Sequence, residues 1–330
     1  MKRREAGRVF WVKLPKAPCG STQAVVVYPA MAESGKSENV PKPAATVVLA
    51  QERNGELQVY LLRRSACSGF MPGNYVFPGG VVDTEDHAPA LWKAHMDMDE
   101  DAFFEKLGGD LTLEEALIYG AAAIRETFEE AGILLASRKP QSQHDLKMAC
   151  KRRMDEKLPK GWLREWVDKE GWILAVSWLA PWSHWITPEA RSRRYDTRFF
   201  IAMTPAEQEC IPDSRETTHG IWINPRKGLK ENLNGDLFLS PPTLVTLHEL
   251  SQYSNMEALA KKLENRAWGE ACLPILIRSQ QEALILLPED PMYNRAREID
   301  ITSQEKVPLA VGDAFSRLWY HEGSWIPLKS

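Results

Sequence analysis

The chain has 330 residues, of which 44% are hydrophobic and 26% charged, and its formal net charge is −4. This composition is typical of a folded globular protein and argues against collagen-like, coiled-coil and disordered chains. Because the charge balance is slightly acidic and no apolar run approaches the ~20 residues that span a bilayer, we expect neither nucleic acid nor a membrane as a partner. Met1–Gly20 lacks an apolar secretion segment and the five cysteines form no C-x-x-C pair, which predicts a cytoplasmic chain.

Shifts in composition divide the chain into three expected parts. Residues 1–43 form a mixed N-terminal segment that ends in a polar run, and the main domain is expected at 44–253. A polar and acidic stretch at about 83–111 is interpreted as an insertion rather than a core element. Residues 254–330 are expected to form a C-terminal extension with a helix and short strands.

The main domain is predicted to begin with a β-hairpin. Ala45–Ala50 and Leu57–Leu62 are rich in β-forming residues, and Asn54-Gly55 between them suits a tight turn with positive φ. The following stretch, Ser65–Gly80, is interrupted by glycine and proline, apart from a short strand expected at Tyr75–Phe77. A functional loop is therefore expected there.

A long helix is predicted at Leu113–Ala131. Thr112 and Glu115 have the spacing of a capping box, in which the hydroxyl and the carboxylate satisfy backbone donors at the helix start. Apolar residues then recur at three- and four-residue spacing as one stripe, and Gly132 can end the helix in the left-handed conformation.

Downstream, the sequence predicts further helices and strands around a group of tryptophans. Residues 138–171 are charged and expected to be helical. The tryptophans are interpreted as core residues, with stacking on a base or sugar as the alternative. The remaining expected elements are strands at Arg198–Met203, Gly220–Ile223, Pro274–Ile277 and Ala283–Leu287, and helices at Thr243–Gln252 and Met256–Asn265, the second with a Ser254-x-x-Glu257 box.

Three carboxylates are expected on one side of the long helix. Glu126 precedes Glu129 by three residues and Glu130 by four, so all three can project away from the apolar stripe. Such clustering is unfavourable without a cation, and oxygen ligands suit Mg²⁺ or Mn²⁺ better than Zn²⁺. Arg125 can pair with Glu129 four residues later and hold its rotamer. A solvated acidic helix face is the alternative interpretation.

The segment from Arg125 to Ile133, Arg-Glu-Thr-Phe-Glu-Glu-Ala-Gly-Ile, resembles the second half of the Nudix hydrolase box, and Phe77-Pro78-Gly79-Gly80 resembles its entrance. The resemblance implies an α/β fold, an α/β/α sandwich with a mixed β-sheet, and Mg²⁺- or Mn²⁺-dependent hydrolysis of a diphosphate linkage. It also implies that the metal ligands are Glu126, Glu129 and Glu130, that the catalytic residues are Glu126, Glu129 and Arg125, and that Gly79 and Gly80 lie next to the diphosphate.

The box departs from the family pattern in its length. Here 44 residues separate Gly80 from Arg125, whereas the family pattern has 13, so the box is split by about 31 extra residues. Leu117 stands where the family has its middle glutamate. We therefore expect altered loop geometry more than a loss of metal binding.

The segment before the box narrows the expected substrate. Arg64-Ser65, Gly73, Phe77-Pro78-Gly79-Gly80 and Asp83 resemble the coenzyme A pyrophosphatase signature, with Gly69 in place of its second arginine. Together with the split box, these residues are most similar to the peroxisomal acyl-coenzyme A diphosphatase branch. Hydrolysis of coenzyme A or acyl-coenzyme A is thus the expected activity.

Coenzyme A carries a 3′-phosphate, so clustered arginines are expected to bind it. Arg64 and Arg198 are the predicted substrate-binding residues, and Arg63, Arg193 and Arg194 are further candidates. The last residues, Leu328-Lys329-Ser330, are not the S-K-L peroxisomal address, so that location is not carried over.

Two alternatives stay open. The first is a Nudix pyrophosphatase for ADP-ribose, dinucleotides or nucleotide sugars, because Gly69 replaces an arginine of the coenzyme A signature. The second is a non-catalytic Nudix-like nucleotide-binding module whose interrupted box does not assemble. Glu216 is a weak candidate for an additional ligand or base, and His219 is assigned no role. Residues 272–330 are expected to cover the site or to form a homodimer contact.

Overall fold

The computed structural model describes residues 39–65, 71–138, 143–155, 158–213, 215, 217–280 and 282–329. Gly69, Glu216 and nearly all of the N-terminal segment lie outside these residues. The helices are α1 Pro89–Ala94, α2 Glu100–Leu107, α3 Leu113–Ala131, α4 Gln143–Asp155, α5 Trp162–Glu170, α6 Pro225–Leu233, α7 Pro241–Leu250 and α8 Met256–Leu263, with 3₁₀ turns η1 Thr84–Asp86, η2 Val176–Trp178 and η3 Tyr293–Glu298.

The strands form a large mixed sheet, a C-terminal sheet and a small two-stranded ladder. They are β1 Lys42–Arg53, β2 Glu56–Arg64, β3 Tyr75–Val76, β4 Gly79–Val81, β5 Ala136–Ser137, β6 Ile173–Leu174, β7 Ala180–Ile186, β8 Tyr195–Met203, β9 Thr217–Ile223, β10 Ala271–Cys272, β11 Ile275–Arg278, β12 Ala283–Leu286, β13 Arg317–His321 and β14 Ser324–Leu328. The large sheet has the order β10-β7-β8-β1-β2-β3, with β4 also paired to β1 and β9 to β2. β1 and β8 are parallel, which confirms the mixed sheet.

Strand β1 has two different antiparallel partners along one edge. Its first half, Ala44–Thr46, pairs with β4, whereas its last residues, Ala50–Arg53, pair with β2 across the Asn54-Gly55 turn. The predicted hairpin is confirmed, with φ of 55° at Asn54 and 76° at Gly55. The sheet therefore divides between β4 and β2, and this division lies beside the C-terminal half of α3.

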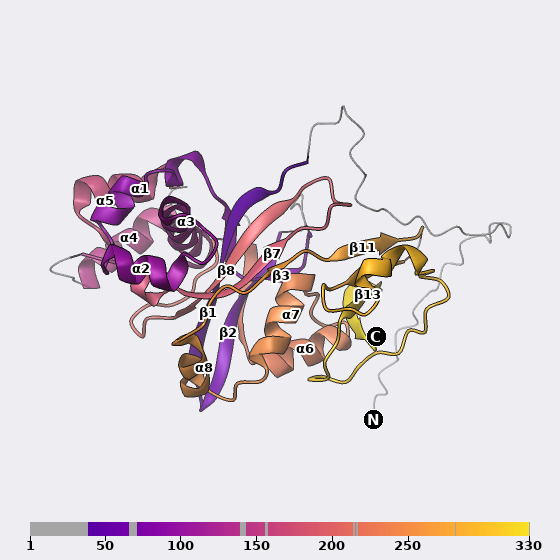
Figure 1. The fold of residues 1–330 in the computed structure, drawn as a ribbon. Helices are drawn as coiled ribbons and strands as arrows, with labels where there is room; N and C mark the ends of the chain where they lie inside the picture. The colour runs from indigo at the N-terminus through magenta and orange to yellow at the C-terminus, as the bar shows by residue number, and fades with distance from the viewer. Residues whose placement is uncertain are drawn as a thin grey trace, which may run out of the picture.

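The two faces of the sheet bury separate cores because side chains alternate along each strand. Val47 and Leu49 pack with α3 and the neighbouring helices, whereas Val48 and Ala50 pack with α7 and the C-terminal sheet. Figure 1 shows helices α1 to α5 gathered on one side of the sheet and α6, α7 and the C-terminal strands on the other. The second core includes Leu276 and so continues past the boundary expected at residue 253.

Helix α3 has the predicted bounds. The Thr112–Glu115 capping box is formed at its start, and Gly132 ends it with φ of 77°. Helix α8 also begins at the expected residue, but its cap is the Asn255 side chain, which accepts from the backbone N–H of Ala258, rather than the Ser254 box.

The expectation that residues 83–111 contribute nothing to the core was wrong, whereas their interpretation as an insertion stays a prediction. The segment forms η1, α1 and α2, and its large apolar side chains Trp92, Phe103 and Leu107 are at most 1% exposed. These residues pack in the same core as α3. Its overall polarity concealed them, because short amphipathic helices need only one or two buried side chains each.

Most of the tryptophans are core residues, as expected. Trp162, Trp166 and Trp172 are at most 6% exposed and form a chain of ring contacts with Phe128. Among the six tryptophans between residues 162 and 185, Trp178 is the exception, with 43% exposure. None of the helices described here is long and apolar enough to cross a bilayer.

Candidate active site

The two halves of the split motif meet in space. The backbone N–H of Gly79 donates to Oε2 of Glu130 at 2.9 Å, although 51 positions separate the two residues in the chain. A Cβ added at Gly79 would lie 2.4 Å from the carbonyl oxygen of Ala45, and one at Gly80 would lie 2.5 Å from Oε1 of Glu126. Only glycine lets strand β4 approach both β1 and α3 this closely.

Arg125 joins these halves to the segment between them. Its Nε and one terminal nitrogen donate to the two carboxylate oxygens of Asp86, each at 2.9 Å, and the same nitrogen donates to the carbonyl oxygen of Val81. The other terminal nitrogen lies 2.8 Å from Oε1 of Glu126 and 3.4 Å from Oε2 of Glu129. The expected contact with Glu129 is present, but the bidentate pair with Asp86 is the tighter one.

Asp86 is a site residue that the sequence analysis missed. It lies in η1, is 1% exposed, and accepts a further hydrogen bond from the backbone N–H of Asp83. Its sequence signal was its place within an acidic stretch, which we interpreted as an insertion rather than a core element. Burial of a carboxylate requires a partner of this kind, since an unpaired buried charge is costly.

The first two carboxylates of the motif differ in their surroundings. Burial raises the pKa of Glu126 to about 7, against the opposing effect of the Arg125 charge. Burial also raises the pKa of Glu129, whose Oε1 accepts a hydrogen bond from Nε1 of Trp162 at 2.6 Å. Trp162 thus holds Glu129 from the helical layer, a contact that the tryptophan spacing alone did not reveal.

The end of α3 is held by an arginine that the sequence analysis did not single out. Arg153, on α4, donates to the carbonyl oxygens of Glu129, Glu130 and Ile211 at 2.8 to 3.0 Å. The carbonyls of Glu129 and Glu130 are among those that a helix leaves without an internal partner at its C-terminal end, whereas Ile211 lies outside α3. Arg153 therefore fixes the last turn of α3, which carries two of the carboxylates.

The predicted metal ligands fit a cation site in part. Glu126 and Glu130 border one cavity, whereas Glu129 does not line it and is held by Trp162 and Arg125. Within the described ranges, no group of three or more His, Cys, Asp or Glu side chains is close enough to hold an ion. The two carboxylates offer the oxygen ligands that Mg²⁺ and Mn²⁺ prefer. The three-residue ligand set stays a prediction.

The cavity beside these carboxylates has a volume of about 340 Å³. Gly79 and Gly80 line it together with Arg64 at the end of β2, and the role of these residues in substrate binding stays a prediction. Thr197 and Phe199 contribute the sheet face, and the start of α7 at Pro241–Thr243 lies across from it. The site is thus a cleft between the divided sheet and the second layer.

Arg198 does not line this cavity, which corrects its predicted role in substrate binding. Its neighbours Thr197 and Phe199 point into the cavity, so strand alternation places Arg198 on the opposite face. There it is 2% exposed, donates to both oxygens of Asp110 at 2.7 and 2.9 Å, and lies over the ring of Trp268. Arg198 therefore links β8 to the segment before α3.

The other candidate arginines also lie outside the cavity lining. Arg63 and Arg193 are exposed, and Arg194 donates to the backbone carbonyl oxygens of Thr187 and Asn39. Arg191 lines the cavity instead. A run of arginines gives no indication of which one points inward, because the loop between β7 and β8 has no regular period.

The C-terminal extension closes one side of the cavity. Leu276 of β11 and Ile285 of β12 are directly paired across their ladder, and both side chains line the cavity. They are 1% and 3% exposed. These two residues place the extension at the cavity wall, and both of its expected roles, covering the site and forming a homodimer contact, stay predictions.

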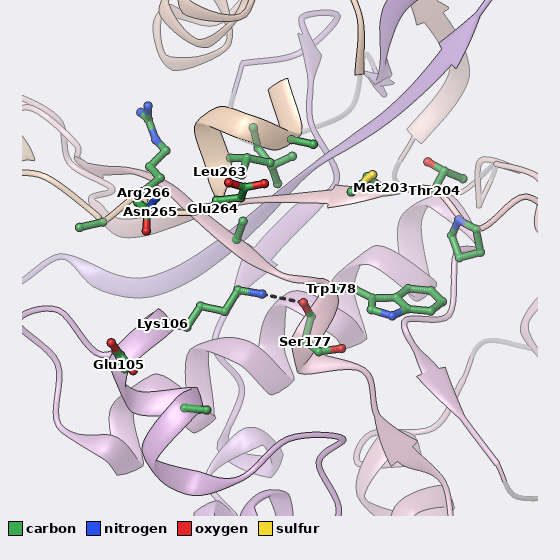
Figure 2. A pocket seen from close by; sticks show the side chains of 16 residues that line it. Glu105, Lys106, Ser177, Trp178, Met203, Thr204, Leu263, Glu264, Asn265 and Arg266 are labelled. Atoms are coloured by element: carbon green, nitrogen blue, oxygen red, sulfur yellow. Dashed lines mark hydrogen bonds between the residues drawn. The ribbon is translucent and has the colours of Figure 1, made fainter. Parts of the chain in front are cut away.

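A second cavity of about 940 Å³ lies elsewhere, between α2, η2 and the chain after α8. Figure 2 shows Nζ of Lys106 donating to the carbonyl oxygen of Ser177, with Trp178, Met203 and Glu264 around the opening. Its lining contains none of the motif residues. The larger hollow is therefore separate from the carboxylate cleft.

Comparison with known proteins agrees with this geometry. The family model for the NUDT19 Nudix domain matches residues 24–250. The chain is 28% identical over 306 residues to acyl-coenzyme A diphosphatase NUDT19 of Xenopus laevis, covering 81% of this chain and 79% of that protein. It is 29% identical over 273 residues to the Homo sapiens protein of the same name, covering 72% of each. A NUDIX hydrolase structure from Alicyclobacillus acidocaldarius superposes with a TM-score of 0.53 at 23% identity, covering 69% of this chain and 99% of that one, which supports the fold.

Proposed function

The chain belongs to the NUDT19 Nudix domain family, and from this premise we propose that it hydrolyses the diphosphate linkage of coenzyme A or acyl-coenzyme A. The products would be adenosine 3′,5′-bisphosphate and 4′-phosphopantetheine or its acyl form. The similarity to proteins named acyl-coenzyme A diphosphatase supports this substrate class over ADP-ribose, dinucleotides and nucleotide sugars. Mg²⁺ or Mn²⁺ as the ion, a cytoplasmic location and assembly as a homodimer belong to the same proposal.

One observation carries the proposal. The hydrogen bond from Gly79 to Glu130, with the backbone of Gly80 against the carboxylate of Glu126, brings the interrupted motif together at a cavity. A binding module with a disrupted box would have no need for this contact. The assembled geometry therefore favours an enzyme over the non-catalytic alternative.

The residues around the cavity would have different roles in hydrolysis. Asp86 holds Arg125, and Arg125 orients Glu126 and Glu129. A divalent ion held by Glu126, Glu129 and Glu130 would supply Lewis-acid polarisation of the diphosphate. One of the glutamates would take the proton of the attacking water, and Arg64 would pair with a phosphate oxygen at the cavity wall.

The test is product analysis with the purified full-length chain. We expect coenzyme A to be cleaved in the presence of Mn²⁺ or Mg²⁺ and not after chelation. Glu129→Gln should lower turnover strongly, whereas Glu114→Gln, an exposed carboxylate in the first turn of the same helix, should leave it unchanged. Rapid cleavage of ADP-ribose beside intact coenzyme A would overturn the substrate, and no turnover of any diphosphate would favour the binding module.

A further inference from the structure

Arg191 is a cation that lines the cavity. It lies in the loop between β7 and β8, is partly buried, and borders the cleft that also contains Glu126 and Glu130. Its backbone carbonyl accepts from Asn39, but its guanidinium makes no hydrogen bond or ion pair with any residue in the described ranges. A partly desolvated guanidinium with no acceptor is unfavourable, so a ligand that supplies one would be stabilised there.

A second arginine from a distant part of the chain increases this positive charge. Arg278 ends β11 two residues after the cavity-lining Leu276, so strand alternation places both side chains on the same face, and the charge of Arg278 acts on Arg191. Burial lowers the pKa of Arg191, the charge of Arg278 lowers it further, and the Tyr320 phenol acts in the opposite direction. No carboxylate is among these neighbours. The Arg278 guanidinium likewise has no hydrogen-bonding partner among the residues that the structure describes.

The loop that carries Arg191 follows a strand that is not a neighbour of β4. Strands β4, β1, β8 and β7 are consecutive neighbours, so β4 and β7 are separated by three strand spacings, about 14 Å. Gly79 and Gly80 belong to β4, whereas Arg191 follows β7. A ligand with its diphosphate beside Glu126 would therefore present a different group to Arg191.

We propose that Arg191, reinforced by Arg278, forms a second anion subsite that binds the phosphate monoester of the substrate, the 3′-phosphate of coenzyme A. This inference rests on the proposed function for its substrate. A guanidinium fork matches the oxygens of a terminal phosphate, which is dianionic near neutral pH. The C-terminal extension would thereby contribute to recognition through Arg278 as well as through the apolar pair Leu276 and Ile285.

The experiment compares coenzyme A with 3′-dephospho-coenzyme A. We expect Arg191→Gln to lower kcat/KM for coenzyme A by about 10- to 100-fold, the range for loss of a charged hydrogen bond, and to change it less than twofold for the dephosphorylated substrate. Arg278→Gln should have a smaller effect of the same selectivity, because it acts through longer-range charge. Arg53→Gln, an exposed arginine at the far end of β1, is the charge-matched control and should change neither.

A binding measurement makes the result independent of turnover. Calorimetry should show that the native chain binds adenosine 3′,5′-bisphosphate more tightly than adenosine 5′-monophosphate, and that Arg191→Gln removes the difference. Equal losses for both substrates, or equal affinity of the native chain for both nucleotides, would overturn the subsite. If coenzyme A is not hydrolysed at all, the proposed function fails while the nucleotide titrations still decide on Arg191.

Discussion

Replacing Asp86 with asparagine is expected to lower the free energy of unfolding by about 3 kcal/mol. The Asp86 carboxylate is 1% exposed and accepts two hydrogen bonds of 2.9 Å from Arg125. Removing one partner of a buried ion pair typically costs about 3–5 kcal/mol, because the other charge is left uncompensated. Arg125 keeps Glu126 at 2.8 Å and the carbonyl oxygen of Val81, so we expect the lower end of that range.

Urea titration followed by tryptophan fluorescence measures this change, with the slope of the transition expected to stay constant. Glu85→Gln is the matched control. Glu85 neighbours Asp86 in the chain, but it pairs with Arg164 only at 3.7 Å, and the two side chains are 41% and 54% exposed. Loss of such a pair should change stability by less than about 0.5 kcal/mol. A loss below about 1 kcal/mol for Asp86→Asn would refute the assignment of Asp86 as the buried partner of Arg125.

Two further changes test the site and the C-terminal part of the chain. Gly80→Ala should lower kcat by about a hundredfold in a diphosphatase assay, because the added Cβ would displace the Glu126 carboxylate. Gly120→Ala is the control and should stay active, because its Cβ would meet nothing closer than 4.0 Å. A kcat of Gly80→Ala within threefold of the native value would contradict the packing argument. Burial raises the pKa of Asp290, but hydrogen bonds from Arg317, the Met292 backbone and Ser316 outweigh this and hold it below its usual range. A carboxylate with a depressed folded-state pKa stabilises the fold above its unfolded pKa of about 3.9 and loses that contribution as the pH falls, so Asp290→Asn should flatten the acid side of the stability curve. Urea midpoints that fall equally with pH for the native and the Asp290→Asn protein, between about pH 5 and pH 2, would contradict a stabilising contribution from Asp290.

The sequence was most informative where the determinants are local. Helix α3 was predicted with its observed bounds because a capping box marks one end and Gly132 the other. The hairpin of β1 and β2 was predicted because Asn54-Gly55 tolerates the positive φ that a tight turn requires. The same segments carry the motif residues, so most of the candidate site could be named before its geometry was known.

Residues whose roles depend on distant contacts could not be predicted. Asp86 and Trp162 contact α3 from segments 39 and 33 positions away from their partners. Arg198 was misassigned because the side that a strand residue faces depends on register, and a shift of one residue reverses every side chain. Arg191 went unnoticed because its place at the cavity depends on the course of the loop between β7 and β8, which has no regular period.

Because Gly79 and Glu130 contact each other directly, the geometry of the site does not depend on the length of the segment that joins them in the chain. Lengthening a flexible connection from 13 to 44 residues raises the entropy cost of closing it by only about 1 kcal/mol, since that cost grows with the logarithm of length. Burying one large apolar side chain such as Phe103 returns about 1.5–3 kcal/mol. An insertion that folds into helices of its own can therefore vary in length while the distances between the carboxylates and β4 stay the same.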